Sequence, residues 1–178
     1  IMLGFSLFAV SQLPTENRSL CLGLAFVVLP VILIYPSAKR WFSFPQAILA
    51  VCWGFAVLIP WAASQGNLSG GWPLLTCWGA TLVWTFGFDT VYAMADRDDD
   101  KKLGIKSSAL TLGTKALQTV SFSYALTSCL LGVASFTAGV GWAFWPCWTI
   151  ASFGMQRETF ALRGAKSGSP LFGKHFQH

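Results

Sequence analysis

The sequence predicts an all-α fold, a bundle of helices that crosses a membrane several times. Of its 178 residues, 54% are hydrophobic and only 11% are charged. Apolar runs close to the length of a bilayer crossing recur along the whole chain. No internal repeat or low-complexity segment interrupts them, so we predict one polytopic membrane domain over residues 1–178.

The apolar runs predict six helices in order, of which the first is too short to span a membrane. Their expected ranges are 1–13, 19–35, 45–64, 72–95, 115–136 and 140–156, followed by a polar tail. The ends are marked by Pro14, Pro36, Pro45, Gly70, Gly71 and Pro73. Pro30, Pro60 and Pro146 fall inside the runs, where packing in a bundle can absorb a kink. Since the chain starts at Ile1 in an apolar run and stops in polar sequence, we interpret it as an internal fragment.

The basic residues fall almost entirely on one side of the predicted membrane. If successive loops alternate between sides, Arg18 is alone on the other side. The basic side receives Lys39, Arg40, Arg97, Lys101, Lys102, Lys106, Lys115, Arg157, Arg163, Lys166 and Lys174. This asymmetry satisfies the positive-inside rule and predicts that the basic side faces the cytoplasm, at a bacterial inner membrane or its equivalent. It also accounts for the net charge of +5 without a nucleic-acid partner.

The cysteines indicate neither disulfides nor a zinc site. Cys21, Cys52, Cys77, Cys129 and Cys147 all lie in apolar runs, without a CxxC pair. No signal peptide with a charged start and a small-residue cleavage site is visible, so the helices themselves must direct insertion.

An acidic cluster closes the fourth apolar run. Five of the seven acidic residues fall within twelve positions: Asp89, Asp96, Asp98, Asp99 and Asp100. If this segment is one helix, Asp89, Asp96 and Asp100 share a stripe, with Tyr92 at its edge. Carboxylates at a helix C-terminus oppose the macrodipole and repel one another, so we expect a cation there. Hard oxygen ligands suit Mg²⁺, which usually takes one or two protein carboxylates and shares substrate phosphates.

The same charges allow a plainer interpretation, a hydrated turn in which neighbouring Lys and Arg neutralise the acids. In that case Asp89, at membrane depth, would only bond to another helix. The interleaving of acids with Arg97 and Lys106 also suits a metal-diphosphate, because basic side chains bind phosphate oxygens directly.

A second polar group follows the earlier run that ends on the same side. Tyr35 and Lys39 lie four positions apart and would reach one point if the turn stays helical through Pro36, with Arg40 next to them. Further on, Ser107 or Ser108 is expected to cap the next helix.

Three segments resemble one family. Residues 89–110, DTVYAMADRDDDKKLGIKSSAL, resemble the second Asp-rich motif of the UbiA superfamily of membrane prenyltransferases, in its 4-hydroxybenzoate polyprenyltransferase branch. Residues 35–46 are similar to its YxxxK element and following proline, and residues 172–178 to the loop entering its last helix. The resemblance implies a nine-helix bundle of which this chain supplies roughly the third to eighth helices. The first Asp-rich motif and the last helix would be missing, so we expect this chain alone to be inactive.

The resemblance also implies a reaction and its residues. A polyprenyl group would pass from polyprenyl diphosphate to the ring carbon ortho to the phenol of 4-hydroxybenzoate, in ubiquinone or plastoquinone biosynthesis. The implied catalytic residues are Asp89, Asp96 and Asp100, of which Asp96 and Asp100 would hold Mg²⁺. The implied substrate-binding residues are Tyr35, Lys39, Arg40, Tyr92, Arg97 and Lys106. The isoprenoid tail would lie between helices and extend into lipid.

Two alternatives stay open. One is a prenyltransferase of the same type with another acceptor, such as chlorophyllide, homogentisate, naphthoate or haem. The other is a divalent-cation transporter with Asp89 as the ion site. Transport predicts polar residues through several spans, whereas Asp89 is the only acidic residue at membrane depth in this sequence.

Overall fold

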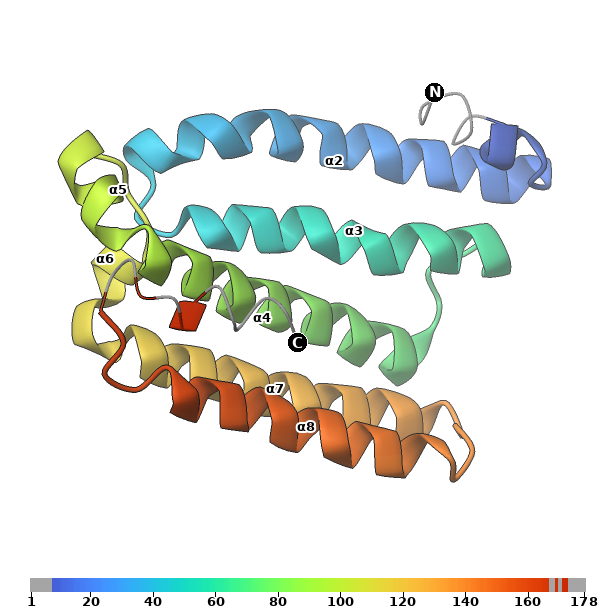
Figure 1. The fold of residues 1–178 in the computed structure, drawn as a ribbon. Coiled ribbons are helices and arrows are strands. Elements are labelled where there is room, and N and C mark those ends of the chain that lie inside the picture. The colour runs from blue at the N-terminus through green and yellow to red at the C-terminus, as the bar shows by residue number, and fades with distance from the viewer. Residues whose placement is uncertain (1–7, 167–168, 170, 173–178) are drawn as a thin grey trace.

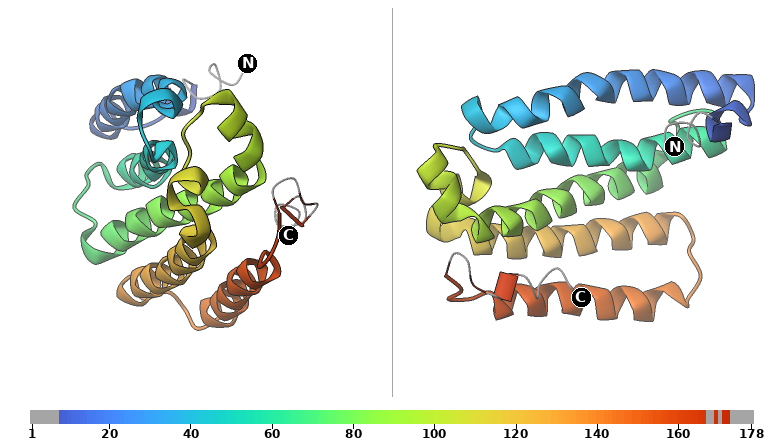
Figure 2. Two further views of the ribbon diagram at one scale, coloured as in Figure 1. Left: turned by 90° about the vertical axis from the view of Figure 1, so that its left-hand side faces the viewer. Right: turned by 45° about the horizontal axis from the view of Figure 1, so that its top comes forward.

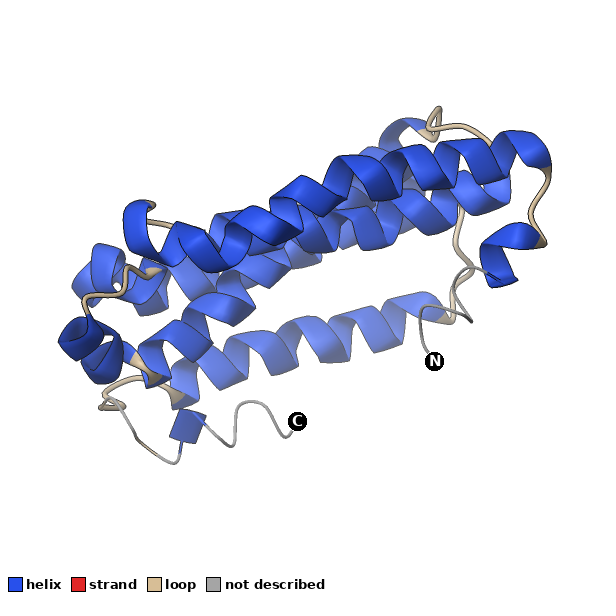
Figure 3. Cartoon of the chain, turned by 90° about the horizontal axis from the view of Figure 1, so that it is seen from above, coloured by secondary structure: helices blue, strands red, loops and turns tan. Residues whose placement is uncertain are grey.

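The structure is a computed structural model that describes residues 8–166, 169, 171 and 172. Every regular element in these residues is helical (Figure 3). The long helices are α2 (Thr15–Trp41), α3 (Pro45–Gln65), α4 (Gly71–Ala95), α7 (Ala116–Thr137) and α8 (Phe144–Ala161). The short ones are α5 (Arg97–Leu103), α6 (Ser108–Leu112) and the 3₁₀ turn η1 (Gly113–Lys115).

The five long helices run side by side, and each packs against the next one along the chain (Figure 1). The order across the bundle is therefore α2, α3, α4, α7 and α8, which the turned views also show (Figure 2). Helices α5 and α6 lie at one end of the bundle, where α2 also connects to α3. The acidic cluster and the Lys39 segment thus share one end, as the loop pattern predicts.

Three stretches of helix in the described residues are long and apolar enough to cross a membrane. They are Thr15–Trp41, Pro45–Gln65 and the continuous helical stretch Ser108–Thr137. Large apolar side chains on their surfaces are exposed, among them Phe26, Leu33 and Phe122. Such a surface suits lipid rather than water, so the chain is an integral membrane protein built as a helical bundle.

Close contact between α4 and α7 builds the tightest part of the core. A Cβ atom placed on Gly87 of α4 would lie 2.9 Å from the Cβ of Ser123 and 3.2 Å from the Tyr124 ring. Small residues allow this approach between membrane helices. Next to it, Val91, Val120, Tyr124, Leu162 and Phe172 form a buried apolar cluster, which holds the end of α4 that carries the acidic residues.

The structure confirms the four complete helices predicted after residue 45 and corrects the end of the one before them. We expected that helix to stop at residue 35, but α2 continues through Pro36 to Trp41. Proline removes one backbone hydrogen bond, yet the following turn is held by a fully buried Ala38 and by the N–H of Phe42, which donates to the Ala38 carbonyl over 2.8 Å. Tyr35 and Lys39 therefore do share one helix.

Of three further expectations, two lie partly outside the described residues and one is wrong. Of the predicted helix 1–13, residues 8–11 are helical and residues 1–7 lie outside the described residues. Most of the loop at 172–178 also lies outside them. The segment 89–100 is not one helix, because α4 ends at Ala95 and α5 begins at Arg97. Asp96 forms the joint, with φ −91° and ψ 5°.

Candidate active site

A polar cavity of about 280 Å³ lies at the end of the bundle where α5 and α6 sit. Its lining combines acidic, basic and amide side chains: Lys39, Gln46, Asp89, Tyr92, Ala93, Asp96, Asp100, Lys106 and Ser107. These residues come from α2, α3, α4, α5 and the loop before α6. Segments up to 68 positions apart in the sequence therefore meet at one cavity.

The three carboxylates that the helical stripe singles out all line this cavity. Asp89 comes from α4, Asp96 from the joint and Asp100 from α5. One carboxylate oxygen of Asp89, Oδ2, is buried and has no hydrogen-bond partner in the described residues. A buried acceptor without a partner is costly, which indicates that this oxygen faces a ligand or a proton in the working protein.

The turn after Asp100 fixes the direction of α5. Gly104 adopts φ 66°, a left-handed conformation that favours glycine. The N–H of Ile105 then donates to the carbonyl oxygen of Asp100 over 2.9 Å, as in a Schellman cap. This cap ends α5 and holds Asp100 at the cavity.

The remaining acids of the cluster do not line the cavity. Asp99 pairs with Lys102 at 2.9 Å, and both side chains are exposed, so this ion pair contributes little to stability. The plainer interpretation of the cluster, a neutralised surface turn, therefore describes Asp99 but not Asp100. Both residues belong to α5, but Asp100 lines the cavity whereas Asp99 is exposed.

Two lysines face the carboxylates across the cavity, and they are joined through the backbone. The N–H of Lys106 donates to the carbonyl oxygen of Lys39 over 2.8 Å. The Lys106 ammonium also donates to the carbonyl oxygen of Trp41 over 3.0 Å. The Lys39 ammonium lies 5.9 Å from the centre of the Tyr35 ring, within the range of a cation–π contact.

Of the other predicted substrate-binding residues, one lines the cavity and three do not. Tyr92 lines the cavity, and its ring lies edge-on to Phe88 with ring centres 5.4 Å apart. Tyr35, Arg40 and Arg97 are not part of the lining. Tyr35 reaches the site through Lys39, whereas Arg40 is exposed on the turn of α2 that follows.

Burial and neighbouring charges act together on Asp100. Burial raises the pKa of its carboxyl above the ordinary value, and Asp96 and Asp99 act in the same direction. A hydrogen bond from the Ser107 side chain and the charge of Lys39 act against them. The net direction is upward, as expected for an acid whose neighbours include other carboxylates.

The lining also contains residues that we did not predict as functional. Gln46, at the start of α3, is 4% exposed and accepts a hydrogen bond from the N–H of Ser108 over 2.9 Å. The hydroxyl groups of Ser108 and Thr90 lie 2.8 Å apart. Ser107 caps α6 as predicted, and its hydroxyl accepts from the N–H of Leu110. The only sequence signal for Gln46 is a polar residue after Pro45, which starts the helix.

The donor set fits Mg²⁺ as a shared ligand of protein and substrate. No group of three or more His, Cys, Asp or Glu side chains within the described residues is arranged to hold a metal ion on its own. The expectation that three carboxylates converge thus holds for the cavity, but not for a complete protein-made metal site. Mg²⁺ needs only one or two carboxylates when phosphate and water complete its shell, a number that Asp96 and Asp100 could supply.

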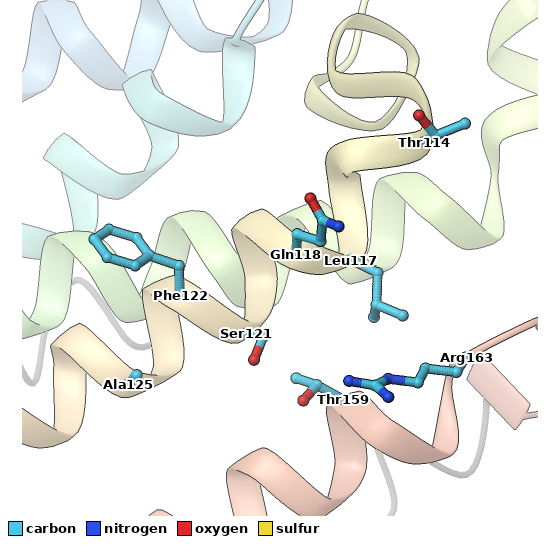
Figure 4. Close-up of a pocket in the computed structure, with 8 residues that line it drawn as sticks. All are labelled: Thr114, Leu117, Gln118, Ser121, Phe122, Ala125, Thr159 and Arg163. Atoms are coloured by element: carbon cyan, nitrogen blue, oxygen red, sulfur yellow. The ribbon is translucent and has the colours of Figure 1, made fainter.

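A larger cavity lies elsewhere, between α7 and α8 (Figure 4). It measures about 540 Å³, and its lining includes Gln118, Ser121, Thr159 and Arg163. Gln156 reinforces this pair of helices, since it accepts a hydrogen bond from the Ser121 hydroxyl over 2.8 Å. No described carboxylate lines this cavity, in contrast to the smaller one.

The fold and the cavity define the class of protein: a helical membrane protein with carboxylates and lysines around one polar cavity at the end of its bundle. Comparison with known proteins makes this specific. Residues 1–176 match the sequence model of the UbiA prenyltransferase family. The chain belongs to that family, and the resemblance found in the 89–110 motif is confirmed.

The related proteins carry consistent names. A 4-hydroxybenzoate solanesyltransferase of Synechocystis sp. is 42% identical over 154 residues, which cover 86% of this chain and 52% of the relative. A 4-hydroxybenzoate octaprenyltransferase of Burkholderia vietnamiensis is 37% identical over 156 residues, which cover 87% of this chain and 52% of the relative. Another from Burkholderia ambifaria is 37% identical over 179 residues, which cover 100% of this chain and 59% of the relative.

The chain thus spans little more than half the length of the relatives it matches. No solved structure matches it. Together, the family and the apolar helices identify the chain as a member of a family of helical membrane prenyltransferases.

Proposed function

We propose that the full-length protein transfers a polyprenyl group from polyprenyl diphosphate to the ring carbon ortho to the phenol of 4-hydroxybenzoate. One observation carries this proposal: Asp96, Asp100, Lys39 and Lys106 line one cavity although they come from separate segments. Carboxylates and lysines together match the charges of a metal-bound diphosphate.

Asp96 and Asp100 would hold Mg²⁺, as hard oxygen donors at the same cavity. When bound, Mg²⁺ neutralises charge on the diphosphate and so makes it a better leaving group. The expected inactivity of the 178-residue chain alone stays a prediction.

The lysines would act on the leaving group. Lys39 and Lys106 line the cavity, and their ammonium groups can bind the phosphate oxygens of the leaving group directly. As the carbon–oxygen bond to the allylic carbon breaks, the diphosphate leaves with the electron pair, and these cations stabilise the charge that develops on it. Tyr35 would hold Lys39 through its ring. Arg40 and Arg97, outside the lining, would add only to the positive potential at the cavity mouth.

The acceptor would bind next to Asp89. The ring carbon ortho to its phenol attacks the allylic cation, then loses a proton and regains aromaticity. The unpartnered Oδ2 of Asp89 supports a role in orienting the phenol. Tyr92 with Phe88 would shelter the cation from water. The isoprenoid tail would extend into lipid between the helices.

The proposal places the cavity at the cytoplasmic face of a bacterial inner membrane or its equivalent. Lys39, Arg40, Lys101, Lys102 and Lys106 all lie at this end of the bundle, which supports that orientation. The basic residues are then accounted for without nucleic acid. The product would enter ubiquinone or plastoquinone biosynthesis.

A panel of acceptors tests the proposal. Membranes that contain the full-length protein would receive polyprenyl diphosphate, Mg²⁺ and one aromatic acceptor at a time, and products would be identified by mass spectrometry. We expect prenylated 4-hydroxybenzoate, and none when Mg²⁺ is chelated. A product formed only from homogentisate, naphthoate, chlorophyllide or haem would contradict the acceptor, and Mg²⁺ uptake without any product would favour transport.

A further inference from the structure

Gln46 is a buried amide in the wall of the carboxylate cavity. It follows Pro45 at the start of α3, is only 4% exposed, and lines the cavity together with Asp89 and Ser107. The sequence motifs assign no role to this residue. A buried amide carries one acceptor oxygen and two N–H donors, all of which need partners.

The hydrogen-bond partner of Gln46 determines how its side-chain amide is oriented. The side-chain oxygen of Gln46 accepts the hydrogen bond from the backbone N–H of Ser108, over 2.9 Å. An N–H needs an acceptor, so the oxygen must face Ser108 and the NH₂ group must point elsewhere. Within the described part of the chain this NH₂ group has no acceptor as a partner.

The surroundings hold the amide rigidly. Ser108 is fully buried, and its hydroxyl lies 2.8 Å from that of Thr90, the neighbour of Asp89 on α4. Thr111, one turn later, donates to the carbonyl oxygen of Ser43 over 2.8 Å. Helix α6 is therefore attached to α3, to α4 and to the loop before α3, and the Gln46 side chain cannot turn without breaking its bond to α6.

We propose that the NH₂ group of Gln46 is a substrate-binding donor, which bonds to an anionic oxygen of the ligand in this cavity. The inference rests on the proposed function and adds a neutral donor to it. The carboxylates of the wall attract a cation, whereas an anionic oxygen needs donors. The lining offers these on Lys39, Lys106 and the Gln46 amide, and on the hydroxyl groups of Tyr92 and Ser107. The oxygen can belong to the diphosphate or to the carboxylate of the aromatic acid.

Two substitutions separate this role from a purely structural one. Gln46→Glu keeps an acceptor for the N–H of Ser108 but removes both donors. Gln46→Met removes the acceptor and the donors without adding charge. Each variant of the full-length protein would be measured for its thermal unfolding temperature in detergent, for KM and kcat, and for the upward shift of that temperature with inorganic pyrophosphate and Mg²⁺.

We expect Gln46→Glu to unfold near the wild-type temperature, while both variants raise the KM of the same substrate by about tenfold or more, the loss typical of a hydrogen bond to a charged group. A raised KM for polyprenyl diphosphate, together with a smaller pyrophosphate shift, assigns the oxygen to the diphosphate. A raised KM for the aromatic acid alone, with an unchanged pyrophosphate shift, assigns it to the carboxylate.

Other outcomes overturn the inference. Wild-type KM values in Gln46→Glu would reduce Gln46 to a support for Ser108. Wild-type KM values in Gln46→Met alone would mean that the added charge of the Glu variant, rather than a lost donor, causes its defect. If the wild-type protein shows no transfer at all, the proposed function fails. The pyrophosphate shift, compared between the wild type and the Gln46 variants, then still shows whether Gln46 binds a diphosphate.

Discussion

The backbone N–H of Lys106 donates a hydrogen bond to the carbonyl oxygen of Lys39 over 2.8 Å. This bond joins the loop before α6 to the last turn of α2, and both lysines line the cavity that Asp96 and Asp100 also line. Cations and carboxylates are thus held in one place by backbone contacts, before any ligand binds.

Removal of Asp96 should abolish catalysis. In the proposed function Asp96 is a ligand of Mg²⁺, so Asp96→Ala should lower kcat by about a hundredfold or more, the range seen when one electrostatic stabiliser of a transition state is lost. Initial rates of 4-hydroxybenzoate prenylation in membranes measure this. Asp98→Ala is the matched control, because Asp98 does not line the cavity. Equal rates for Asp96→Ala and wild type would remove Asp96 from the site.

Loss of the Lys106 ammonium should weaken diphosphate binding. Lys106→Met keeps much of the length of the side chain and its backbone bond to Lys39, but it removes one cation from the cavity. We expect the KM for polyprenyl diphosphate to rise by about tenfold or more, since charge-assisted hydrogen bonds are the stronger kind. Lys102→Met is the control, because Lys102 forms only an exposed pair with Asp99. A similar KM in both variants would contradict the role of Lys106.

Mg²⁺ binding should depend on pH through Asp100. Burial raises the pKa of this carboxyl, so protons compete with Mg²⁺ at a higher pH than they would at an exposed aspartate. Affinity should be full above the raised pKa and fall as the pH falls through it. The stability of the metal-free protein should change in the opposite direction. Between the pKa of Asp100 in the unfolded chain and its raised pKa in the folded protein, the native state binds more protons than the unfolded state. The free energy of unfolding therefore falls as the pH rises.

Titration of Mg²⁺ against thermal unfolding at several pH values measures this dependence. Asp100→Asn should weaken Mg²⁺ binding and flatten its pH dependence, whereas Asp98→Asn should leave the pH dependence in place. An unchanged pH profile in Asp100→Asn would assign the titration to another group.

The sequence predicts the helices better than it predicts the candidate site. Apolar runs predict the helices well, because membrane spans need a minimum length. The end of α2 is missed because Pro36 favours a helix end in isolation, whereas buried Ala38 and the Phe42 bond keep the last turn helical. That outcome depends on neighbours that no local pattern contains.

The residues of the cavity are also predicted only in part, because some of their contacts join segments that lie far apart in the sequence. Helical spacing predicts that Asp89, Asp96 and Asp100 lie together, and all three line one cavity although the chain bends at Asp96. Gln46 is missed because its partner, Ser108, lies 62 positions away. A single glutamine at the start of an apolar helix carries no pattern that predicts such a contact.

The contact between α4 and α7 should be sensitive to one added methyl group. Gly87→Ala would place a Cβ 2.9 Å from the Cβ of Ser123, and overpacking of this kind typically costs about 1–3 kcal/mol. Thermal unfolding in detergent should therefore occur at a lower temperature. Gly154→Ala in α8 is the control, since nothing lies within 4 Å of its added Cβ and alanine favours a helix. Equal destabilisation by both changes would show that packing against Ser123 is not the cause.

The most direct test of the central claim is the binding of inorganic pyrophosphate to the purified full-length protein, with and without Mg²⁺, measured by the shift in thermal unfolding temperature. Asp96 and Asp100 on the cavity wall predict a shift that requires Mg²⁺ and disappears when both are changed to alanine. A shift of the same size without Mg²⁺, or in the double variant, would contradict the claim that these carboxylates hold a metal-bound diphosphate.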